Sequence, residues 1–312
     1  YKAENIKVLE GLEAVRKRPA MYIGGTGKDG LHHLVYEVVD NSVDECLAGF
    51  CTVIDVTINK DGSVTVKDDG RGIPVDMHPT YKKPAIEIAL TKLHAGGKFE
   101  KSAYQISGGL HGVGVSCVNA LSKKLNAKVF RDGKIHEQEY NIGKPAYGLK
   151  VIGKSDRNTT GTEITFHPDS EIFSTLDFDF AVLRKRLQEI AFLNPVKIIL
   201  KDDKHGKKEV FHYTGGLTEF ASHINKSKTV LHKPIYFKRQ EEGTVVEVAV
   251  QYTDSYNENI FGFVNTINTT EGGTHISGFK TALTRAVNDY ISKKGLLKNE
   301  KLSGDDTREG LT

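Results

Sequence analysis

The sequence contains no tryptophan, only two methionines and three cysteines, and no apolar run of about 18 residues. The last absence means that no membrane-spanning helix is expected. Cys46, Cys51 and Cys117 are odd in number and show no CxxC spacing, which argues against a disulfide framework or a zinc site. Free cysteines are typical of a reducing compartment, so we expect a cytoplasmic location. The charged start of the chain lacks the apolar segment of a secretory signal.

An excess of charge of one sign is also missing. Lys and Arg number 43 and Asp and Glu number 40, giving a net charge of +3, which is too balanced to predict nucleic-acid binding by itself. Hydrophobic residues make up 38% and charged residues 27%, as in ordinary globular proteins. The length of 312 residues allows two domains.

Hydrophobic periodicity and turn residues predict the main elements. Helices are predicted over 31–48, 84–96, 115–122, 180–194 and 278–291, where apolar residues recur at helical spacing. Strands are predicted over 52–70 as a hairpin turning at Asp61-Gly62, over 128–140 as a hairpin turning at Asp132-Gly133, and over 161–168 and 244–252. A charged stretch over 201–216 interrupts the pattern, so we place a domain boundary near residue 213. Hairpins with helices grouped between them favour an α+β two-layer sandwich over a doubly wound sheet.

The segment "SGGLHGVG", residues 107–114, is the richest in glycine. It lacks the Lys-Ser or Lys-Thr of a P-loop and the preceding strand of a dinucleotide fingerprint. A glycine-rich turn that leads into a helix presents backbone N–H groups to an anion. Such turns are also common without any ligand, so this feature alone does not predict a phosphate site.

Two further groups of polar residues could complete a site. Glu37 and Asn41 are four residues apart and lie one turn apart on one helix face. A Glu there could activate water, and an Asn oxygen suits Mg²⁺, although a solvated helix face is the commoner explanation. Asp68 alternates with Val64 and Val66, so it is either a buried carboxylate that needs a donor, such as an adenine amino group, or the start of a turn. Gly70 and Gly72 in "DDGRGIP" would leave room for a flat ring.

These stretches together resemble a known family. In order and at about the right distances, "EVVDNSVDE", "DDGRGIP", "GGLHGVG" and "TGTEITF" resemble the four boxes of the GHKL ATPases. "LEAVRKRPAMYIG", "LHAGGKF" and "GGTH" narrow the resemblance to the ATPase (B) subunits of type IIA topoisomerases, those of DNA gyrase and topoisomerase IV. The resemblance implies a GHKL (Bergerat) ATPase sandwich with an N-terminal dimerisation arm over 1–213. A transducer domain similar to domain 2 of ribosomal protein S5 is implied over 214–312.

The resemblance assigns roles residue by residue. Glu37 matches the general base, Asn41 the Mg²⁺ ligand and Asp68 the adenine-reading carboxylate. Thr162 would act next to Asp68 through a water molecule. The ATP-binding residues implied in addition are Tyr1 on the arm, Gly72, Ile73, Lys98, Tyr104, Gly109, Leu110, His111, Gly112, Val113, Gly114 and Val115. Arg71, Pro74 and Arg131 would lie at the mouth of the pocket, where coumarin inhibitors bind.

The implied function is an ATP-operated clamp that dimerises on binding ATP, works with DNA and the A subunit of gyrase in an A2B2 complex, and drives negative supercoiling. The family's phosphate-binding Lys belongs to a Gln-Thr-Lys motif that would follow "DDTREGL", and no Gln-Thr-Lys is present. We therefore expect a chain that binds adenine nucleotide but hydrolyses ATP weakly.

Other functions remain open at this level. The B subunit of topoisomerase IV shares these motifs, with decatenation as its reaction. A chaperone or mismatch-repair ATPase shares only the nucleotide boxes, and a histidine kinase would need a phosphoacceptor helix domain that the sequence does not indicate. A non-catalytic nucleotide-binding module would be favoured if Glu37 were absent, and Glu37 is present.

Overall fold

The computed structural model describes residues 9–97, 112–297 and 300–312. The chain forms two compact units, Tyr1–His212 and Tyr213–Thr312. Among the described helices, none combines the length and the apolar character needed to cross a membrane.

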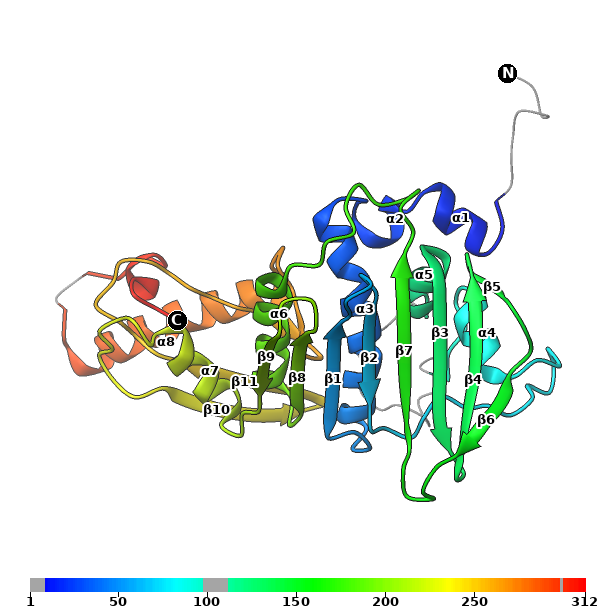
Figure 1. Ribbon diagram of the computed structural model, residues 1–312. Helices are drawn as coiled ribbons and strands as arrows, with labels where there is room; N and C mark the ends of the chain where they lie inside the picture. The colour runs from blue at the N-terminus through cyan, green and yellow to red at the C-terminus, as the bar shows by residue number, and fades with distance from the viewer. Residues whose placement is uncertain (1–8, 98–111, 298–299) are drawn as a thin grey trace. The chain divides into compact units, whose positions relative to one another are not determined.

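A nine-stranded sheet is the framework of the first unit (Figure 1). Its strands are β1 (Val53–Ile58), β2 (Val64–Asp68), β3 (Ser122–Arg131), β4 (Lys134–Asn141), β5 (Lys144–Pro145), β6 (Lys150–Lys154), β7 (Gly161–Pro168), β8 (Lys197–Asp202) and β9 (Lys207–Phe211). Their order is β5-β4-β3-β7-β2-β1-β8-β9, with β6 beside β4. The pairings between these strands are antiparallel apart from that of β1 with β8.

Helices pack against one face of this sheet (Figure 1). They are α1 (Leu12–Lys17), α2 (Ala20–Ile23), α3 (Lys28–Leu47), α4 (Ala85–Thr91), α5 (Gly114–Ala120) and α6 (Phe180–Leu193). Along β1, buried and half-buried residues alternate, so every second side chain enters the core between sheet and helices. This arrangement confirms the predicted α+β two-layer sandwich.

Helix α3 carries several of the expected site residues, and its apolar stripe explains where it lies. Leu31, Leu34, Val35, Val38 and Val39 are buried, at the helical spacing that predicted the element. The helix begins at Lys28, three residues earlier than predicted, and ends at Leu47. Burial of this stripe fixes the rotation of the helix, so its polar side chains lie beside the buried face.

The two predicted hairpins of the sheet are confirmed. Gly62 turns the chain between β1 and β2 with φ +84°, and Asp132-Gly133 joins β3 to β4 with φ values of +54° and +71°. Glycine adopts a positive φ without the steric penalty of a side chain. The register puts Asp68 opposite Ile54, on the buried face with Val64 and Val66.

Several parts of the secondary structure differ from the prediction, among them strands β5 and β6, which it lacked. Helices α1 and α2 were not predicted, and α1 is held by Arg16, which donates to the carbonyl of Ala120 at 2.8 Å and pairs with Asp169 at 2.7 Å. Helix α4 ends at Thr91, short of Gly96. The charged stretch near residue 201 forms part of the β8–β9 hairpin, and β8 also pairs with β1. The prediction missed this hairpin because its Lys and Asp residues hide the usual alternation of a strand.

The second unit contains two strand pairs and a long helix. Its elements are α7 (Gly216–Ile224), β10 (Ile235–Glu241), β11 (Thr244–Val250), β12 (Phe263–Val264), β13 (Ile267–Asn268), α8 (Thr274–Lys294) and η3 (Asp306–Arg308). Strands β10 and β11 form an antiparallel hairpin, and β12 pairs with β13. The predicted strand at 244–252 and helix at 278–291 are confirmed, with α8 four residues longer at its start.

Candidate nucleotide site of the first unit

Glu37 lies on the third turn of α3 and makes a direct contact with a histidine. His33 Nε2 lies 2.9 Å from Glu37 Oε1, one turn earlier on the same helix. This hydrogen bond raises the pKa of His33 above its ordinary value, against the opposing effect of burial. His33 was not predicted as a site residue, although the spacing of four residues between His33 and Glu37 was a signal for this contact. Asn41 follows one turn later and is half-buried.

The other carboxylate oxygen of Glu37 faces the start of α5. A Cβ atom added at Gly114 would lie 1.9 Å from Glu37 Oε2, so only glycine fits at this position. Gly112, just before the helix, has φ +62°, and Val113 and Val115 are half-buried on either side of Gly114. The end of the glycine-rich segment is thus in contact with the candidate base, although the two are far apart in sequence.

Asp68 is a buried carboxylate, with 8% of its surface exposed. Its Oδ1 accepts from the backbone N–H of Gly70 at 3.0 Å and of Thr162 at 3.1 Å, and its Oδ2 accepts from the Ser42 hydroxyl at 2.8 Å. Burial raises the pKa of Asp68, although these hydrogen bonds act in the opposite direction. The sequence predicted a carboxylate that needs a hydrogen-bond donor, whereas the protein itself supplies three donors.

Three of about four acceptor positions on this carboxylate are therefore occupied. Oδ1 receives two of the hydrogen bonds and Oδ2 only one, so the remaining lone pair belongs to Oδ2. The Thr162 side chain also takes part in the local network, because its Oγ1 accepts from the N–H of Ile73 at 3.2 Å.

Glycines bring the backbone close to Asp68. Gly161 has φ +145°, and an added Cβ atom would lie 2.1 Å from the carbonyl oxygen of Asp68. Gly72 has φ +78°, and an added Cβ atom would lie 3.0–3.1 Å from Val129 Cγ1 and two carbonyl oxygens. These positions require glycine both for conformation and for space.

Two arginines lie at this end of the site and are held in place. Arg71 pairs with Glu45, with Nη2 2.8 Å from Oε1 and Nε 3.0 Å from Oε2, and its guanidinium lies 4.1 Å from the centre of the Phe50 ring. Arg131 Nη1 donates to the carbonyl of Gly72 at 2.9 Å. Glu45 was not predicted as a site residue, because its partner comes from a different element. Pro74 follows nearby and is exposed.

Six of the expected site residues lie outside the described part of the chain. They are Tyr1, Lys98, Tyr104, Gly109, Leu110 and His111.

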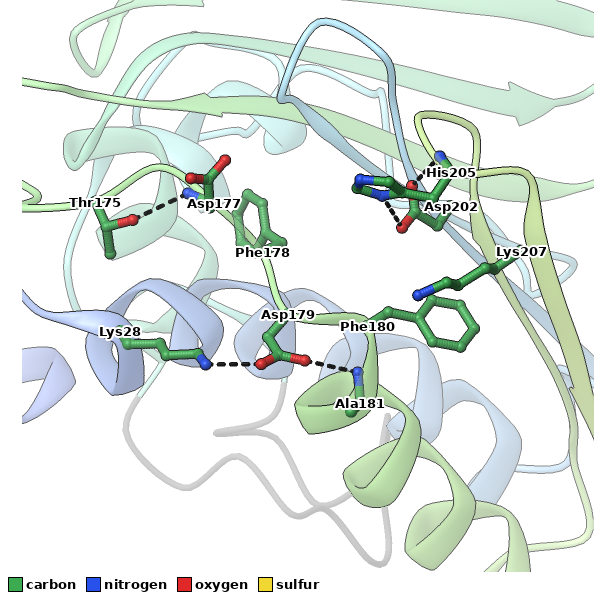
Figure 2. A pocket seen from close by; sticks show the side chains of 10 residues that line it. All are labelled: Lys28, Thr175, Asp177, Phe178, Asp179, Phe180, Ala181, Asp202, His205 and Lys207. Carbon is green, nitrogen blue, oxygen red and sulfur yellow. Dashed lines mark hydrogen bonds and ion pairs between the residues drawn. The ribbon is translucent and has the colours of Figure 1, made fainter.

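A pocket of about 460 Å³ lies elsewhere on this unit and contains none of the expected residues (Figure 2). Lys28 pairs with Asp179 at 2.7 Å, Asp179 also accepts from the N–H of Ala181, and Asp202 lies 2.8 Å from His205. The other charged groups drawn there are also engaged, because Asp177 lies 3.6 Å from Lys204 and Lys207 lies over the Phe180 ring. This pocket therefore does not compete with Asp68 and Glu37 as the candidate site.

Two families of known proteins match parts of the chain. Residues 26–172 match the family described as histidine kinase-, DNA gyrase B-, and HSP90-like ATPase, and residues 216–312 match the family DNA gyrase B. The crystal structure of the 43K ATPase domain of Thermus thermophilus gyrase B, in complex with an aminocoumarin, is 45% identical, with a TM-score of 0.82. The alignment covers 97% of this chain and 80% of that one. The chain belongs to the gyrase B family.

Other members are similar over the whole chain. The B subunit of DNA gyrase from Clostridium acetobutylicum is 57% identical over 317 residues, covering 100% of this chain and 50% of that protein. The topoisomerase IV ATP-binding domain of Francisella tularensis, solved with a small-molecule inhibitor, is 34% identical with a TM-score of 0.78, over 97% of this chain and 81% of that one. The chain thus spans about half the length of the curated gyrase B it matches. The matches confirm the predicted GHKL ATPase fold and the gyrase B domain that follows it.

Proposed function

We propose that the chain forms the ATP-binding and ATP-hydrolysing part of a gyrase B protein. The observation that carries this proposal is the contact between the Glu37 carboxylate and Gly114. It joins a potential general base to the end of a glycine-rich turn that leads into a helix. Such a turn offers backbone N–H groups to phosphate, so the base would lie beside the bond to be broken.

Glu37 would act as the general base. In this role its carboxylate takes a proton from the water that attacks the γ-phosphate, while His33 orients it from the side of Oε1. The other carboxylate oxygen, Oε2, faces the start of α5. Gly112 to Val115 would then supply part of the phosphate-binding backbone, and Gly109, Leu110 and His111 would continue it.

Asp68 would read adenine. An adenine amino group donates hydrogen bonds, and the lone pair left on Asp68 Oδ2 can accept one. Thr162, Gly72 and Ile73 would form the adjoining wall, where the glycine conformation permits close approach of a flat ring. A guanine would present a carbonyl oxygen in place of the amino group, so the same site disfavours GTP.

Asn41 is the proposed Mg²⁺ ligand. Mg²⁺ prefers oxygen ligands, keeps several waters and commonly uses one or two protein groups together with substrate phosphates. Asn41, a half-buried residue one turn from Glu37, can supply one such oxygen. When bound, Mg²⁺ would neutralise charge on the phosphates.

The remaining roles follow from membership in the gyrase B family and are proposals here. Tyr1, Lys98 and Tyr104 would contact ATP from the arm and the lid. Arg71, Pro74 and Arg131 would form the mouth where a coumarin binds, as an aminocoumarin does in the Thermus thermophilus domain. In the whole protein, ATP would close a homodimer on DNA, together with the A subunit of gyrase, in the cytoplasm.

A topology assay tests the proposal. The full-length protein that contains this chain, combined with the A subunit of gyrase, should introduce negative supercoils into relaxed plasmid only when ATP is present. The higher identity to a gyrase domain, 45% against 34% for topoisomerase IV, favours this outcome over decatenation. Decatenation without supercoiling, with a topoisomerase IV partner, would assign the chain to topoisomerase IV.

A further inference from the structure

The second unit contains a loop of unusual charge, residues 225–234 between α7 and β10, here called the lysine loop (Figure 1). No acidic residue occurs between Glu219 and Glu241, whereas five Lys and Arg residues do: Lys226, Lys228, Lys233, Lys238 and Arg239. This is a local excess of positive charge in a chain that is otherwise nearly balanced.

Three of these five cations have no carboxylate partner in the described residues. Lys238 pairs with Glu247 at 2.7 Å, and Arg239 pairs with Glu241 at 3.2 Å. Over 9–97, 112–297 and 300–312, no ion pair involves Lys226, Lys228 or Lys233. Their charge is therefore available to an external anion.

The lysines border a pocket of about 380 Å³, whose lining includes Asn225, Lys226, Lys228, His232, Lys233 and Gln251. Two of these side chains are buried, with exposed fractions of 1% for Asn225 and 3% for Gln251. Asn225 Nδ2 donates to Gln251 Oε1 at 3.0 Å, and Gln251 Nε2 donates to the carbonyl of His232 at 2.9 Å. The pocket is thus lined in part by a buried pair of amide side chains, which also binds the loop backbone at His232.

His232 fixes the other end of the loop and contributes no charge in doing so. Its Nδ1 lies 2.6 Å from the carbonyl of Lys233, which can only accept, and its Nε2 lies 3.0 Å from the N–H of Tyr252, which can only donate. The ring is therefore the neutral tautomer with the proton on Nδ1. The N–H of Leu231 also donates to the carbonyl of Tyr252 at 2.9 Å. A loop held at both ends loses little conformational freedom when it binds a ligand.

We infer that the lysine loop binds the phosphodiester backbone of duplex DNA, through Lys226, Lys228 and Lys233. Lysine ammonium groups are common phosphate ligands, and duplex DNA carries a negative charge about every 1.7 Å along its axis. Three ammonium groups on one preorganised loop can meet such a surface together. The choice of DNA over other polyanions rests on the proposed function.

An acidic protein is the competing partner class. Val230 and Leu231 in the same loop are 44% and 64% exposed, and an acidic peptide with apolar residues could use them. Contacts to DNA phosphates differ from contacts to an acidic peptide in their salt dependence, because each phosphate contact releases a counterion from the DNA. The test therefore measures a salt slope and includes an acidic peptide.

The experiment is fluorescence anisotropy of a labelled duplex of about 30 base pairs, titrated with the 312-residue chain at salt concentrations from about 50 to 200 mM. The variant replaces Lys226, Lys228 and Lys233 by Gln. The matched control replaces Lys293, Lys294 and Lys301 by Gln, which removes the same charge from exposed positions of the same unit. A third protein with Arg at positions 226, 228 and 233 keeps the charge.

Log affinity falls with log salt concentration, and this fall should become less steep by about 2.7 in the Gln variant. That value is about 0.9 for each of three lost phosphate contacts. The affinity should fall roughly tenfold or more at about 100 mM salt, while the Arg variant retains both values. Equal slopes for the Gln variant and the control would overturn the inference. It would also be overturned if an acidic peptide of matched charge bound more tightly than the duplex and lost its binding in the Gln variant.

ATP turnover without DNA separates this inference from the proposed function. In the full-length protein, the Gln variant should hydrolyse ATP at the unmodified rate, because none of the proposed nucleotide-binding residues belongs to the lysine loop. Absence of ATP binding in the unmodified chain would contradict the proposed function, whereas the salt slopes would still decide the lysine loop.

Discussion

The two ends of the proposed nucleotide site differ in how firmly the protein holds the carboxylate at each end. At the adenine end, Asp68 is 8% exposed and accepts three hydrogen bonds from other segments of the chain. At the phosphate end, the Glu37 side chain is 29% exposed and is paired with His33 of its own helix. One carboxylate is fixed by the fold, and the other is oriented by a neighbour.

This difference suggests that the two carboxylates have different roles, one in binding and one in turnover. A buried, fully supported acceptor can select a base without rearrangement, because the protein has already satisfied its other positions. A half-exposed carboxylate beside a glycine turn can meet water and phosphate, which a buried one could not. Substitutions at the two ends should therefore separate binding from turnover.

The largest effect is expected at the phosphate end. In the full-length protein, Glu37→Gln should reduce ATP turnover by about 10²–10⁴-fold, because the amide cannot take a proton from water. ATP affinity should change little, since the adenine contacts are intact. Phosphate release and calorimetry on the same preparation measure both, with Glu171→Gln at an exposed position as control. Turnover equal to that of the control would rule Glu37 out as the base.

The next effect is expected at the adenine end. Asp68→Asn keeps the shape of the side chain but can present N–H₂ where the adenine amino group needs an acceptor. Affinity for ATP should fall by roughly 1.5–3 kcal/mol, or about 10- to 150-fold. Asp202→Asn is the matched control, since Asp202 is also buried and accepts from His205 in the pocket of Figure 2. An equal loss in both variants would mean that the effect is structural.

A smaller effect on stability is expected from Gly161→Ala. The new Cβ atom would lie 2.1 Å from the carbonyl oxygen of Asp68, and φ +145° is unfavourable for alanine. The free energy of unfolding should decrease by about 1–3 kcal/mol. Gly148→Ala, where an added Cβ atom meets nothing within 4 Å, should leave the urea midpoint nearly unchanged. Similar midpoints for the two variants would show that the backbone relaxes and that the adenine end is not rigid.

The smallest effect concerns pH and the His33–Glu37 pair. The pKa of His33 is raised in the folded protein, so the pair stabilises the fold fully below the unfolded value of 6.5 and less as the pH rises through the folded value. His33 is 39% exposed, so solvent screening should limit the effect to less than about 1 kcal/mol. The difference in urea midpoint between the chain and His33→Gln should be larger at pH about 5.5 than at pH about 8.5. The opposite trend would contradict the pairing.

The sequence predicted the parts of the fold whose signals are local. Helix α3 and the hairpin turns at Gly62 and Gly133 follow from periodicity and turn residues. The β8–β9 hairpin and helix α1 did not, because β8 depends on pairing with β1 and α1 depends on the contacts of Arg16. Such tertiary contacts override weak local preferences.

The candidate site shows the same limit. The residue types at Glu37, Asn41 and Asp68 could be read from spacing, and the resemblance supplied their roles. The contact of Glu37 with Gly114 joins two distant segments, and the three donors around Asp68 come from α3, the turn after β2 and strand β7. No local pattern in the sequence contains that information.

The most direct test of the account compares two ligands by calorimetry on the 312-residue chain, a non-hydrolysable ATP analogue and its GTP counterpart. If Asp68 selects adenine through a preformed acceptor, the ATP analogue should bind at least about tenfold more tightly, a difference of about 1.4 kcal/mol. Equal affinities for the two analogues would contradict the claim that the adenine end is built to read the base.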